Sequence, residues 1–537
     1  MRTDIAALVS DNLDVWMTAV ERKSGAGRKG GKKLSLYGIE RLRALILSLA
    51  VRGKLVPQDV GDEPAASHLK TARENLASAA PGIGRMRWKP SRSFDDSETS
   101  RKLPAGWSLA RVNDTGFYIN GLAFKPSDWA SSGRRIIRIQ NLTNPEAPYN
   151  FAVGEFPDEV IVRDGDLLVS WSATLAAFQW SGEEAVLNQH IFRVIREPSL
   201  TDHAFLRLLL EHAVAEMADS DHAHGLVMAH INRGPFLDHL VAIPPLAEQR
   251  RIVAKVDELM ALCDALEVQS TSALDSHQLL VKSLIATLLN RTVANDLAAD
   301  WARLSSYFDI LFVDEASVSV LKSAIVELAL SGFLTGSAPF DEKSLSQILT
   351  FGPKNGYSPR AVDIDTGVKS LSLSATTKGE FDGDHYKFVD IERPEPSSEL
   401  WLKNGDVLIQ RANSIDYVGV SAIYEGDDNQ FIYPDLMMKL RFSDEVYPKF
   451  AILCLNSNSV REYFRSRASG TSGSMPKINQ ITVLSARVPV PDLAQQLHIV
   501  AKVDELVVLC DALKTRIADA DETRRDLADT IVERAAT

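Results

Sequence analysis

The sequence is poor in features that would place it in several common protein classes. It has three cysteines in 537 residues, and no two of them form a C-x-x-C pair, which excludes a disulfide framework and argues against a zinc finger. No segment approaches the roughly 18 consecutive apolar residues of a membrane span. Aspartates at positions 4, 11 and 14 interrupt the region where a signal peptide needs an apolar core. We therefore expect a cytoplasmic protein without a membrane partner.

Positive charge is also scarce. The chain carries 59 Lys and Arg against 71 Asp and Glu, a net charge of −12, which is the wrong sign for a protein that coats nucleic acid. Any contact with DNA must then be local or shared with basic partners. The clearest local excess is ERKSGAGRKGGKK at 21–33, which we interpret as a solvated flexible loop, with a phosphate-contacting loop as the alternative. No apolar strand precedes it, so it is not a nucleotide-binding loop.

Catalytic signatures are missing as well. The nearest approach to the [ND]-P-P-[FYW] loop of an adenine methyltransferase is Asn144-Pro145-Glu146, which fails, and no helicase phosphate loop is present. The histidines His222, His224 and His230 have no acidic or sulfur ligand at a standard spacing, so no metal site is predicted. We expect a chain that is not an enzyme and has no catalytic, cofactor-binding or metal-ligating residues.

An internal repeat organises what is present. The segment LAEQRRIVAKVDELMALCDALE at 246–267 returns as LAQQLHIVAKVDELVVLCDALK at 493–514, with sixteen of 22 positions identical and an offset of 247. A weaker repeat matches 42–55 to 321–334. The stretches between these blocks resemble each other only faintly. The sequence is therefore a tandem duplication with similar frames and dissimilar centres.

Each strong repeat begins a long helix with an apolar seam. The seam of the first copy is Ile252, Val256, Leu259, Cys263, Leu266, Ser270, Ala273, His277, Leu280 and Leu284, and that of the second is Ile499, Val503, Leu506, Cys510, Leu513, Ile517, Ala520, Arg524, Leu527 and Ile531. A periodicity of 3.5 residues predicts a coiled coil in which the two copies pair. Because a short proline-containing step joins each variable stretch to the start of its own helix, we expect the helices to be antiparallel.

The two variable stretches are interpreted as α+β. Strand-like segments are predicted at 134–142, 164–173 and 190–195 in the first stretch, and at 367–374, 404–414 and 435–442 in the second. Helices are predicted at 205–217 and 447–464. Polar residues at the strand ends are of types that pair with base edges, although ordinary surface turns are the alternative explanation. These candidates are Ser170, Trp171, Asn188, Gln189 and His190 in the first stretch and Tyr357, Arg411, Asn413 and Ser414 in the second.

A polar loop occupies the same repeat position in both stretches. It is AHGLVMAHINR at 223–233 and GTSGSMPKINQ at 470–480, and backbone N–H groups with one cation in such a loop can contact phosphate. The candidate DNA-binding residues of these loops are His230, Asn232, Arg233, Ser472, Ser474, Lys477 and Asn479.

Four segments, LSLYGIERLRALILSLAVRGKLVPQD, LNQHIFRV, IPPLAEQRRIVAKVDELM and GTSGSMPKINQ, carry a resemblance over nearly the whole chain. It resembles the specificity subunit of type I DNA restriction-modification enzymes. The resemblance implies two target recognition domains that each read half of a split, asymmetric double-stranded DNA sequence. Helices would form the spacer and hold two modification subunits, and restriction subunits would join. S-adenosylmethionine, ATP and Mg would then belong to those partners. This sequence departs from the family's pattern at 24–33 and 81–102.

The expected fold is α+β, with two globular recognition domains separated by a long antiparallel two-helix coiled coil in a pseudo-two-fold repeat. The predicted divisions are a helical region at 1–103, recognition domain 1 at 104–245, a central spacer region at 246–345, recognition domain 2 at 346–491 and a spacer helix at 492–537. The alternative functions are a coiled-coil scaffold that joins two proteins without reading DNA and a methyltransferase with fused recognition domains, which lacks a cofactor site.

Overall fold

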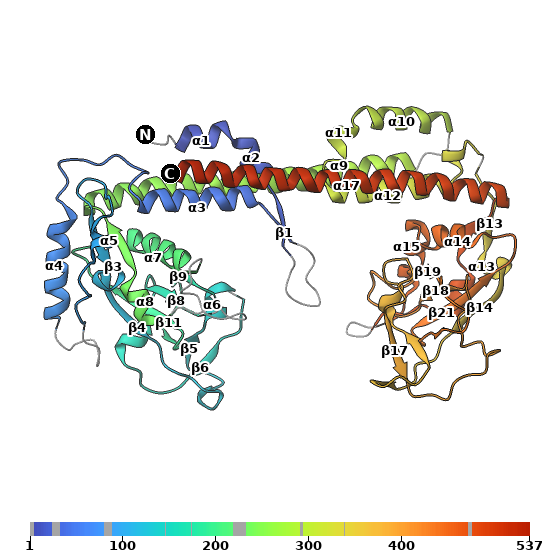
Figure 1. Cartoon of the computed structure of the whole chain (residues 1–537), viewed down its shortest axis with the longest axis horizontal. Helices are drawn as coiled ribbons and strands as arrows, with labels where there is room; N and C mark the ends of the chain where they lie inside the picture. Colours follow the sequence, from blue (N-terminus) through green and yellow to red (C-terminus); the bar gives the residue numbers. More distant parts are fainter. Residues whose placement is uncertain are drawn as a thin grey trace. The chain divides into compact units, whose positions relative to one another are not determined.

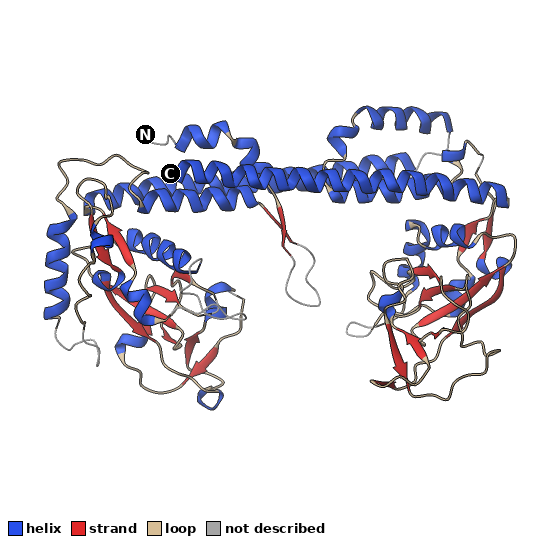
Figure 2. Ribbon diagram, in the orientation of Figure 1, coloured by secondary structure: helices blue, strands red, loops and turns tan. Residues whose placement is uncertain are grey.

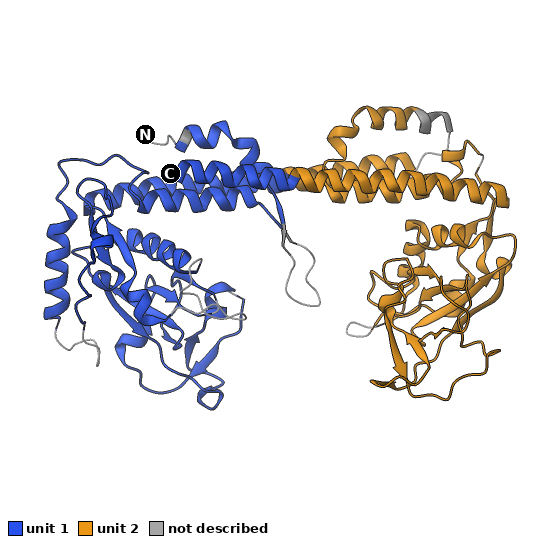
Figure 3. Ribbon diagram, viewed as in Figure 1, with its two compact units in different colours: residues 1–272, 521–537 blue, residues 273–520 orange. Residues whose placement is uncertain are grey.

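The computed structural model describes residues 5–23, 33–79, 88–144, 146–172, 174–218, 232–289, 294–337, 339–470 and 475–536. Contacts divide the chain into unit 1, residues 1–272 and 521–537, and unit 2, residues 273–520 (Figure 3). Both units combine helices with sheets, which confirms the α+β fold class (Figure 2). Within the ranges described, no helix is long and apolar enough to cross a membrane.

Unit 1 combines helices with two four-stranded sheets and one two-stranded sheet in its variable stretch (Figure 1). Its helices are α1 (Ile5–Asp11), α2 (Leu13–Thr18), α3 (Tyr37–Val51), α4 (Ala65–Ser78), α5 (Asp96–Thr99), α6 (Ile139–Thr143), α7 (His203–Ala218), α8 (Arg233–Asp238) and the first part of α9 (Leu246–Leu289). Its strands are β1 (Glu21–Lys23), β2 (Lys33–Ser35), β3 (Ser108–Arg111), β4 (Gly116–Asn120), β5 (Arg134–Ile137), β6 (Asn150–Ala152), β7 (Ile161–Val162), β8 (Leu167–Ser170), β9 (Ala176–Gln179), β10 (Ala185–Leu187), β11 (Ile191–Arg196) and β12 (Leu240–Ile243).

Unit 2 has the same kinds of element in a similar order. Its helices are the last part of α9, α10 (Ala294–Ser306), α11 (Phe308–Leu311), α12 (Glu315–Leu330), α13 (Leu345–Ile348), α14 (Pro448–Leu455), α15 (Asn458–Arg467), α16 (Gln480–Leu484) and most of α17 (Leu493–Ala536), whose end belongs to unit 1. Its strands are β13 (Glu342–Ser344), β14 (Leu349–Asn355), β15 (Ala361–Val362), β16 (Lys369–Leu371), β17 (Tyr386–Val389), β18 (Val407–Gln410), β19 (Ser421–Ile423), β20 (Phe431–Ile432), β21 (Met437–Phe442) and β22 (Arg487–Pro489).

The sheets of the two units have matching topologies. One four-stranded sheet has the order β4-β11-β8-β9 in unit 1 and β14-β21-β18-β19 in unit 2, and every neighbouring pair in both is antiparallel. In a second sheet, β10 pairs parallel with β5 and β20 pairs parallel with β16. A two-stranded sheet, β12-β3 or β22-β13, precedes the long helix in each unit. The dissimilar centres therefore share the first sheet and the parallel pair of the second sheet. They differ in the remaining strand of the second sheet, which is β7 beside β10 in unit 1 and β15 beside β17 in unit 2.

The long helices α9 and α17 pack together in the antiparallel sense. In unit 1, residues near the start of α9, such as Ile252 and Val256, share a hydrophobic cluster with Ala528 near the end of α17. In unit 2, Ile285 near the end of α9 shares a cluster with Ile499 near the start of α17. The burial of these apolar positions stabilises the helices far more than their intrinsic propensity does. The antiparallel pairing inferred from the sequence is confirmed.

A third helix joins the pair in each unit, and the weaker repeat encodes it. In unit 1, Arg43 of α3 pairs with Asp264 of α9 at 2.6 Å. In unit 2, Lys322 of α12 pairs with Asp511 of α17 at 2.9 Å. The two cations occupy one position of the weaker repeat, and the two aspartates occupy one position of the stronger repeat. The prediction of two helices alone was thus incomplete, because each unit packs three.

The predicted seam of α9 is correct as far as Ser270 and wrong beyond it. Leu280 and Leu284 are 50% and 39% exposed, whereas Val281 and Ile285 are buried. An α-helix with 3.6 residues per turn drifts by about 20° per heptad relative to a strict 3.5-residue repeat, so the buried line moves by one residue. The same change occurs in α17, where Leu527 is 47% exposed and Ala528 is buried.

Several predicted elements are shorter than expected, and in two of them a side chain of the chain's own turn competes with regular pairing. The strand expected at 134–142 ends at Ile137, where the backbone N–H of Arg138 donates to Oδ1 of Asn141 at 3.1 Å and opens α6. The helix expected at 447–464 is interrupted, and the side chain of Ser457 caps the start of α15.

Candidate nucleic-acid interface

A buried glutamine attaches each variable stretch to the start of its long helix. In unit 1, Gln249 accepts from the N–H of Asp202 at 2.6 Å and donates to the carbonyls of Leu200 and Pro244, each at 2.9 Å. Gln249 is fully buried. The side chain therefore links the β11–α7 connection to the first turn of α9. A buried amide with all these bonds satisfied fixes the orientation of the attachment.

Unit 2 repeats this attachment. Gln496, also fully buried, accepts from the N–H of Tyr447 and donates to the carbonyls of Glu445 and Pro491, all at 2.8 Å. Gln249 and Gln496 are the shared Gln of the LAEQ and LAQQ segments. Part of the sequence identity between the two repeat copies is therefore explained by the hydrogen bonds that this glutamine makes in each unit.

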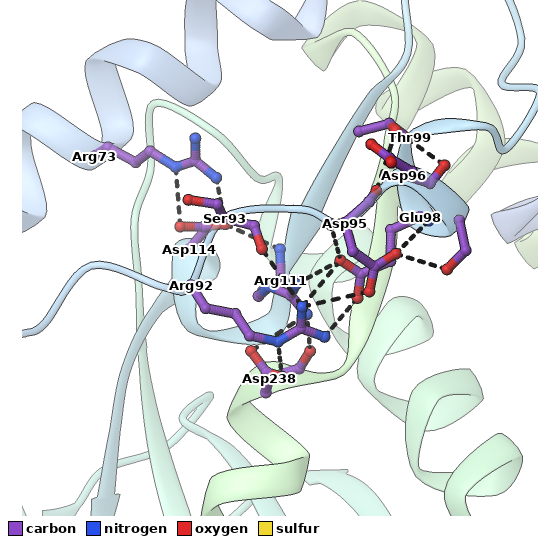
Figure 4. Close-up of polar contacts among 11 residues, drawn as sticks. Arg73, Arg92, Ser93, Asp95, Asp96, Glu98, Thr99, Arg111, Asp114 and Asp238 are labelled. Carbon is purple, nitrogen blue, oxygen red and sulfur yellow. Dashed lines mark hydrogen bonds and ion pairs between the residues drawn. The ribbon is translucent and has the colours of Figure 1, made fainter.

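Polar residues at 92–98 form a second attachment in unit 1 (Figure 4). Arg111 of β3 is buried, pairs with Glu98 at 2.9 Å and donates to the carbonyl of Asp238 at 2.6 Å. Arg92 bridges the carboxylates of Glu98 and Asp238 at 2.6 and 2.9 Å. Although burial opposes ionisation of Glu98, the N–H of Asp95 and the two guanidinium groups hold its pKa below the ordinary value. The segment 92–98, within the part that departs from the family pattern, thus secures the base of the variable stretch.

The strand ends of unit 1 bring five predicted residues together. The N–H of Trp171, just after β8, donates to the carbonyl of His190 at 3.4 Å, and their rings lie 5.2 Å apart. Gln189 is exposed, and its amide lies 3.2 Å from Nε2 of His190. Asn188 is half-buried beside them. Ser170 differs, because it is fully buried and its hydroxyl donates to the carbonyl of Ser172.

Arg233 supports this face from α8. Its guanidinium donates to the carbonyl of Tyr118 at 2.7 Å and to Oδ1 of Asn120 at 2.8 Å, and it lies over the ring of Phe192. Burial lowers the pKa of Arg233. Asn120 in turn donates to the carbonyl of Gln189 at 3.3 Å. The predicted DNA-binding residue Arg233 thus positions the strand ends that carry the other candidates.

The corresponding strand ends of unit 2 bring together another predicted set. The N–H of Arg411, just after β18, donates to the carbonyl of Leu436 at 2.8 Å, in the place that Trp171 has in unit 1. The guanidinium of Arg411 donates to the carbonyl of Asp435 at 3.1 Å. Asn413 donates from Nδ2 to Gln410 and accepts at Oδ1 from the N–H of Ser414. Ser414 and the neighbouring Tyr357 are exposed.

The loop that precedes α16 lies against these residues. The N–H of Ile478 donates to the carbonyl of Arg411 at 3.0 Å, and the N–H of Asn413 donates to the carbonyl of Pro476 at 3.3 Å. Lys477 is exposed on the same segment. Asn479 has a structural task, because its Oδ1 accepts from the N–H of Thr482 and caps α16. Its counterpart Asn232 is exposed at the start of α8 and makes no cap through its side chain.

A glycine directly follows β4 in unit 1 and β14 in unit 2, where each strand reaches the face that carries the candidate residues. A Cβ at Gly121 would collide with the carbonyls of Leu187 and Asn188, and one at Gly356 would collide with those of Tyr433 and Pro434. In both units this glycine follows an asparagine, Asn120 or Asn355. The repeated Asn-Gly pair, a turn signal, marks this edge of the face in the sequence, and our sequence interpretation did not use it.

Three predicted residues, His230, Ser472 and Ser474, lie outside the described residues, as do His222, His224 and the basic segment at 24–32. Residues not predicted from the sequence also reach the two faces. In unit 1 these are Trp129, Arg138 and Gln140, and in unit 2 they are Ser358 and Asp435.

The comparisons with known proteins agree with this arrangement. A family model described as the type I restriction modification DNA specificity domain matches residues 104–275. The EcoEI specificity subunit of a type I restriction enzyme from Escherichia coli is 28% identical over 595 residues, covering 99% of each chain. The EcoAI specificity subunit from the same species is 27% identical over 593 residues, again covering 99% of each chain.

Solved structures give weaker likenesses. The HsdS subunit from Thermoanaerobacter tengcongensis matches with a TM-score of 0.36 and 16% identity, covering 82% of this chain and 98% of that chain. A chain from a study of complex assembly in the type I R-M system matches with a TM-score of 0.46 and 16% identity, covering 81% of this chain and 99% of that chain. The full-length similarity to the EcoEI and EcoAI subunits, together with the family model over residues 104–275, makes this chain similar to the specificity subunits of type I restriction-modification enzymes.

Proposed function

We propose that this specificity subunit reads a bipartite, asymmetric DNA target, with one half-site contacted by each unit. The observation that carries the proposal is the duplicated polar face at corresponding strand ends. The backbone of the face is the same in both units, but its side chains differ. Trp171 and Gln189 in unit 1 correspond to Arg411 and Asp435 in unit 2. Different donors and acceptors on one scaffold pair with different base edges.

The sixteen candidate residues stay proposals for DNA contact, and so do the five predicted divisions of the chain. Arg411 and Asn413 suit base edges because their side chains lie at a strand end with partly free donors. Lys477 suits a phosphate, because it is an exposed cation on a loop that is held by backbone hydrogen bonds.

The chemistry belongs to partner subunits. The chain is the non-catalytic subunit of a cytoplasmic complex. It assembles with two modification subunits and with restriction subunits. S-adenosylmethionine, ATP and Mg are bound by those partners. This chain therefore selects the DNA sequence, and the partner subunits carry out the chemistry.

An exchange of recognition domains tests the proposal. Residues 346–491 would be replaced by the corresponding stretch of a relative, and the methylated motif would be determined by sequencing the genome of cells that express the complex. We expect one half of the motif to change and the other to persist. If both halves changed together, or if the motif stayed as it was, the assignment of one half-site to each unit would be wrong. The second result would favour the scaffold alternative.

A further inference from the structure

A pocket in unit 1 joins three predicted residues to three that the sequence did not reveal. It has a volume of about 270 Å³, and the residues with polar or aromatic groups that line it include Trp129, Arg138, Gln140, Asn188, Gln189 and His190. Parallel pairing of β5 and β10 creates this proximity, because Ile137 lies opposite Leu187 and the N–H of Asn188 donates to the carbonyl of Ile137 at 3.1 Å. Arg138 is thus brought beside Asn188.

Arg138 differs from its neighbours in the way its charge is used. Arg134 and Arg135, on the preceding strand, pair with Glu184 and Glu183 at 3.7 Å each. No carboxylate among the described residues pairs with Arg138, and none lines the pocket. Its guanidinium lies 5.7 Å from the ring centre of Trp129, which is 42% exposed, whereas Arg135 combines its carboxylate partner with a ring contact at 5.1 Å from Tyr149. An aromatic face holds the cation in place and leaves its N–H donors available.

The hydrogen-bond donors of the pocket match the major-groove edge of guanine. A guanidinium presents a planar pair of N–H donors, and the major-groove edge of guanine presents two acceptors, O6 and N7, at a matching spacing. A phosphate could accept from the same donors. The amides of Asn188 and Gln189 beside Arg138 are groups that read base edges, which favours guanine over phosphate.

We infer that Arg138 is a specificity-determining residue that donates two hydrogen bonds to a guanine in the half-site read by unit 1, and that Trp129 is its positioning residue. The inference rests on the proposed function. It adds a named base and a named contact to a unit whose reading residues are otherwise known only as a group.

Methylation sequencing provides the first test. Cells would express the complex with the wild-type chain, with Arg138→Ala or with the control Arg135→Ala, in which a carboxylate-paired arginine of the preceding strand is removed. For Arg138→Ala we expect the motif to relax at one G·C position in the half-site that changes when residues 104–245 are exchanged. Arg135→Ala should keep the wild-type motif. A motif left unchanged by Arg138→Ala would overturn the inference, and so would relaxation in the other half-site.

Binding of modified DNA to the purified modification complex provides the second test. Duplexes would carry 7-deazaguanine, which lacks the N7 acceptor, at each guanine of this half-site in turn. At one position the wild-type complex should bind more weakly, by at most the roughly 5- to 150-fold of one lost bidentate contact, because O6 can still accept one hydrogen bond. Arg138→Ala should show no such sensitivity. If the wild-type complex is insensitive at every guanine, the inference is wrong, whether or not the variant folds.

Two further outcomes separate the remaining explanations. If Arg138 contacts phosphate, Arg138→Ala will weaken all sequences equally and lower the salt dependence of binding, which contradicts the guanine contact. If Trp129 positions Arg138, Trp129→Ala will relax the same G·C position and Trp129→Phe will restore it. Relaxation that Trp129→Phe does not restore would contradict the positioning role. Absence of any bipartite motif in the wild type would instead refute the proposed function, so the two failures are distinguishable.

Discussion

Gln249 and Gln496, which are 247 positions apart in the sequence, make the same set of three hydrogen bonds, each to one N–H and two carbonyls of its own unit. The N–H in both cases lies just before the helix that follows β11 or β21. One carbonyl in both cases belongs to the proline that precedes the long helix. The attachment of a variable stretch to the spacer is therefore a duplicated hydrogen-bonded joint.

This joint should be essential to the stability of its own unit. Gln249→Leu removes three hydrogen bonds and leaves buried backbone groups without partners, which should cost about 2 to 4 kcal/mol of unfolding free energy. We expect scanning calorimetry combined with limited proteolysis to show that unit 1 unfolds earlier while unit 2 is unchanged. Gln496→Leu is the matched variant and should reverse the pattern. Equal destabilisation of both units by either variant would contradict a local role.

The buried Lys439 should make the unfolding free energy of unit 2 depend on pH in the alkaline range. Its side chain is fully buried and donates to the carbonyls of Glu399 and Trp401 at 2.6 and 2.8 Å, close to Asp406. Burial, opposed by Asp406 and assisted by the nearby Arg441, lowers the pKa of Lys439 from 10.5 to about 8. Between these values the unfolded chain holds a proton that the folded chain has released. The contribution of Lys439 to unfolding free energy therefore rises with pH from about 8 to 10.5.

The comparison with Lys439→Met measures this contribution. The difference in unfolding free energy, wild type minus variant, should increase between pH 8 and 10 by at most about 1.4 kcal/mol per pH unit. Denaturant titrations at a series of pH values would provide it. A difference that is constant over this range would show that Lys439 titrates as an ordinary exposed lysine.

Lys477 and Asn479 should affect DNA binding in different ways. If Lys477 contacts a phosphate, Lys477→Ala should weaken binding similarly on all sequences and lower the slope of log affinity against log salt by about one. Asn479→Ala should cost about 1 kcal/mol of stability through the lost cap of α16 and leave the salt slope unchanged. Asn479→Asp keeps the capping oxygen and should retain stability. An unchanged salt slope for Lys477→Ala would exclude the phosphate contact.

Arg461 should hold the turn that follows the candidate DNA-contact residues Arg411 and Asn413 of unit 2. Its buried guanidinium donates to the carbonyls of Val418 and Asp416 at 2.5 and 2.7 Å, and burial lowers its pKa to about 10. Arg461→Met leaves both carbonyls without these donors, at about 1 to 3 kcal/mol each. We expect faster amide hydrogen exchange at 411–420, measured by mass spectrometry. Arg465, which makes a single 3.4 Å contact with the same Asp416 carbonyl, is the control. Equal effects of Arg465→Ala and Arg461→Met would contradict this prediction.

The sequence was most informative where one interaction repeats along the chain. The 3.5-residue pattern of α9 predicted the buried positions from Ile252 to Ser270, because each adds the same kind of contact to the same seam. It failed at Leu280, since the drift of a straight helix accumulates and no local residue marks the change. The predicted strand at 134–142 failed at Asn141 for the opposite reason, because a single local hydrogen bond ended it.

The candidate faces could be proposed from the sequence only in part. Residues such as Asn188 and Arg411 were candidates because they directly follow apolar strand segments, a feature that is local in the sequence. Arg138 was not a candidate, because its position beside Asn188 depends on the parallel pairing of β5 with β10, whose residues are about fifty positions apart. Arg233 also supports this face of unit 1, because its guanidinium contacts Asn120. The positions of the two residues in the sequence do not reveal this contact.

The glycine that directly follows β4 or β14 has an evolutionary consequence. Gly121 and Gly356 meet the carbonyls of the adjacent connection, so this junction is built from main-chain atoms that every amino acid possesses. Mutations at Gln189 or Asp435 therefore leave the junction intact. If the candidate residues read DNA as proposed, each unit can acquire a new target by substitution of side chains alone, and a lineage of such proteins can diversify its targets without redesigning the architecture that presents them.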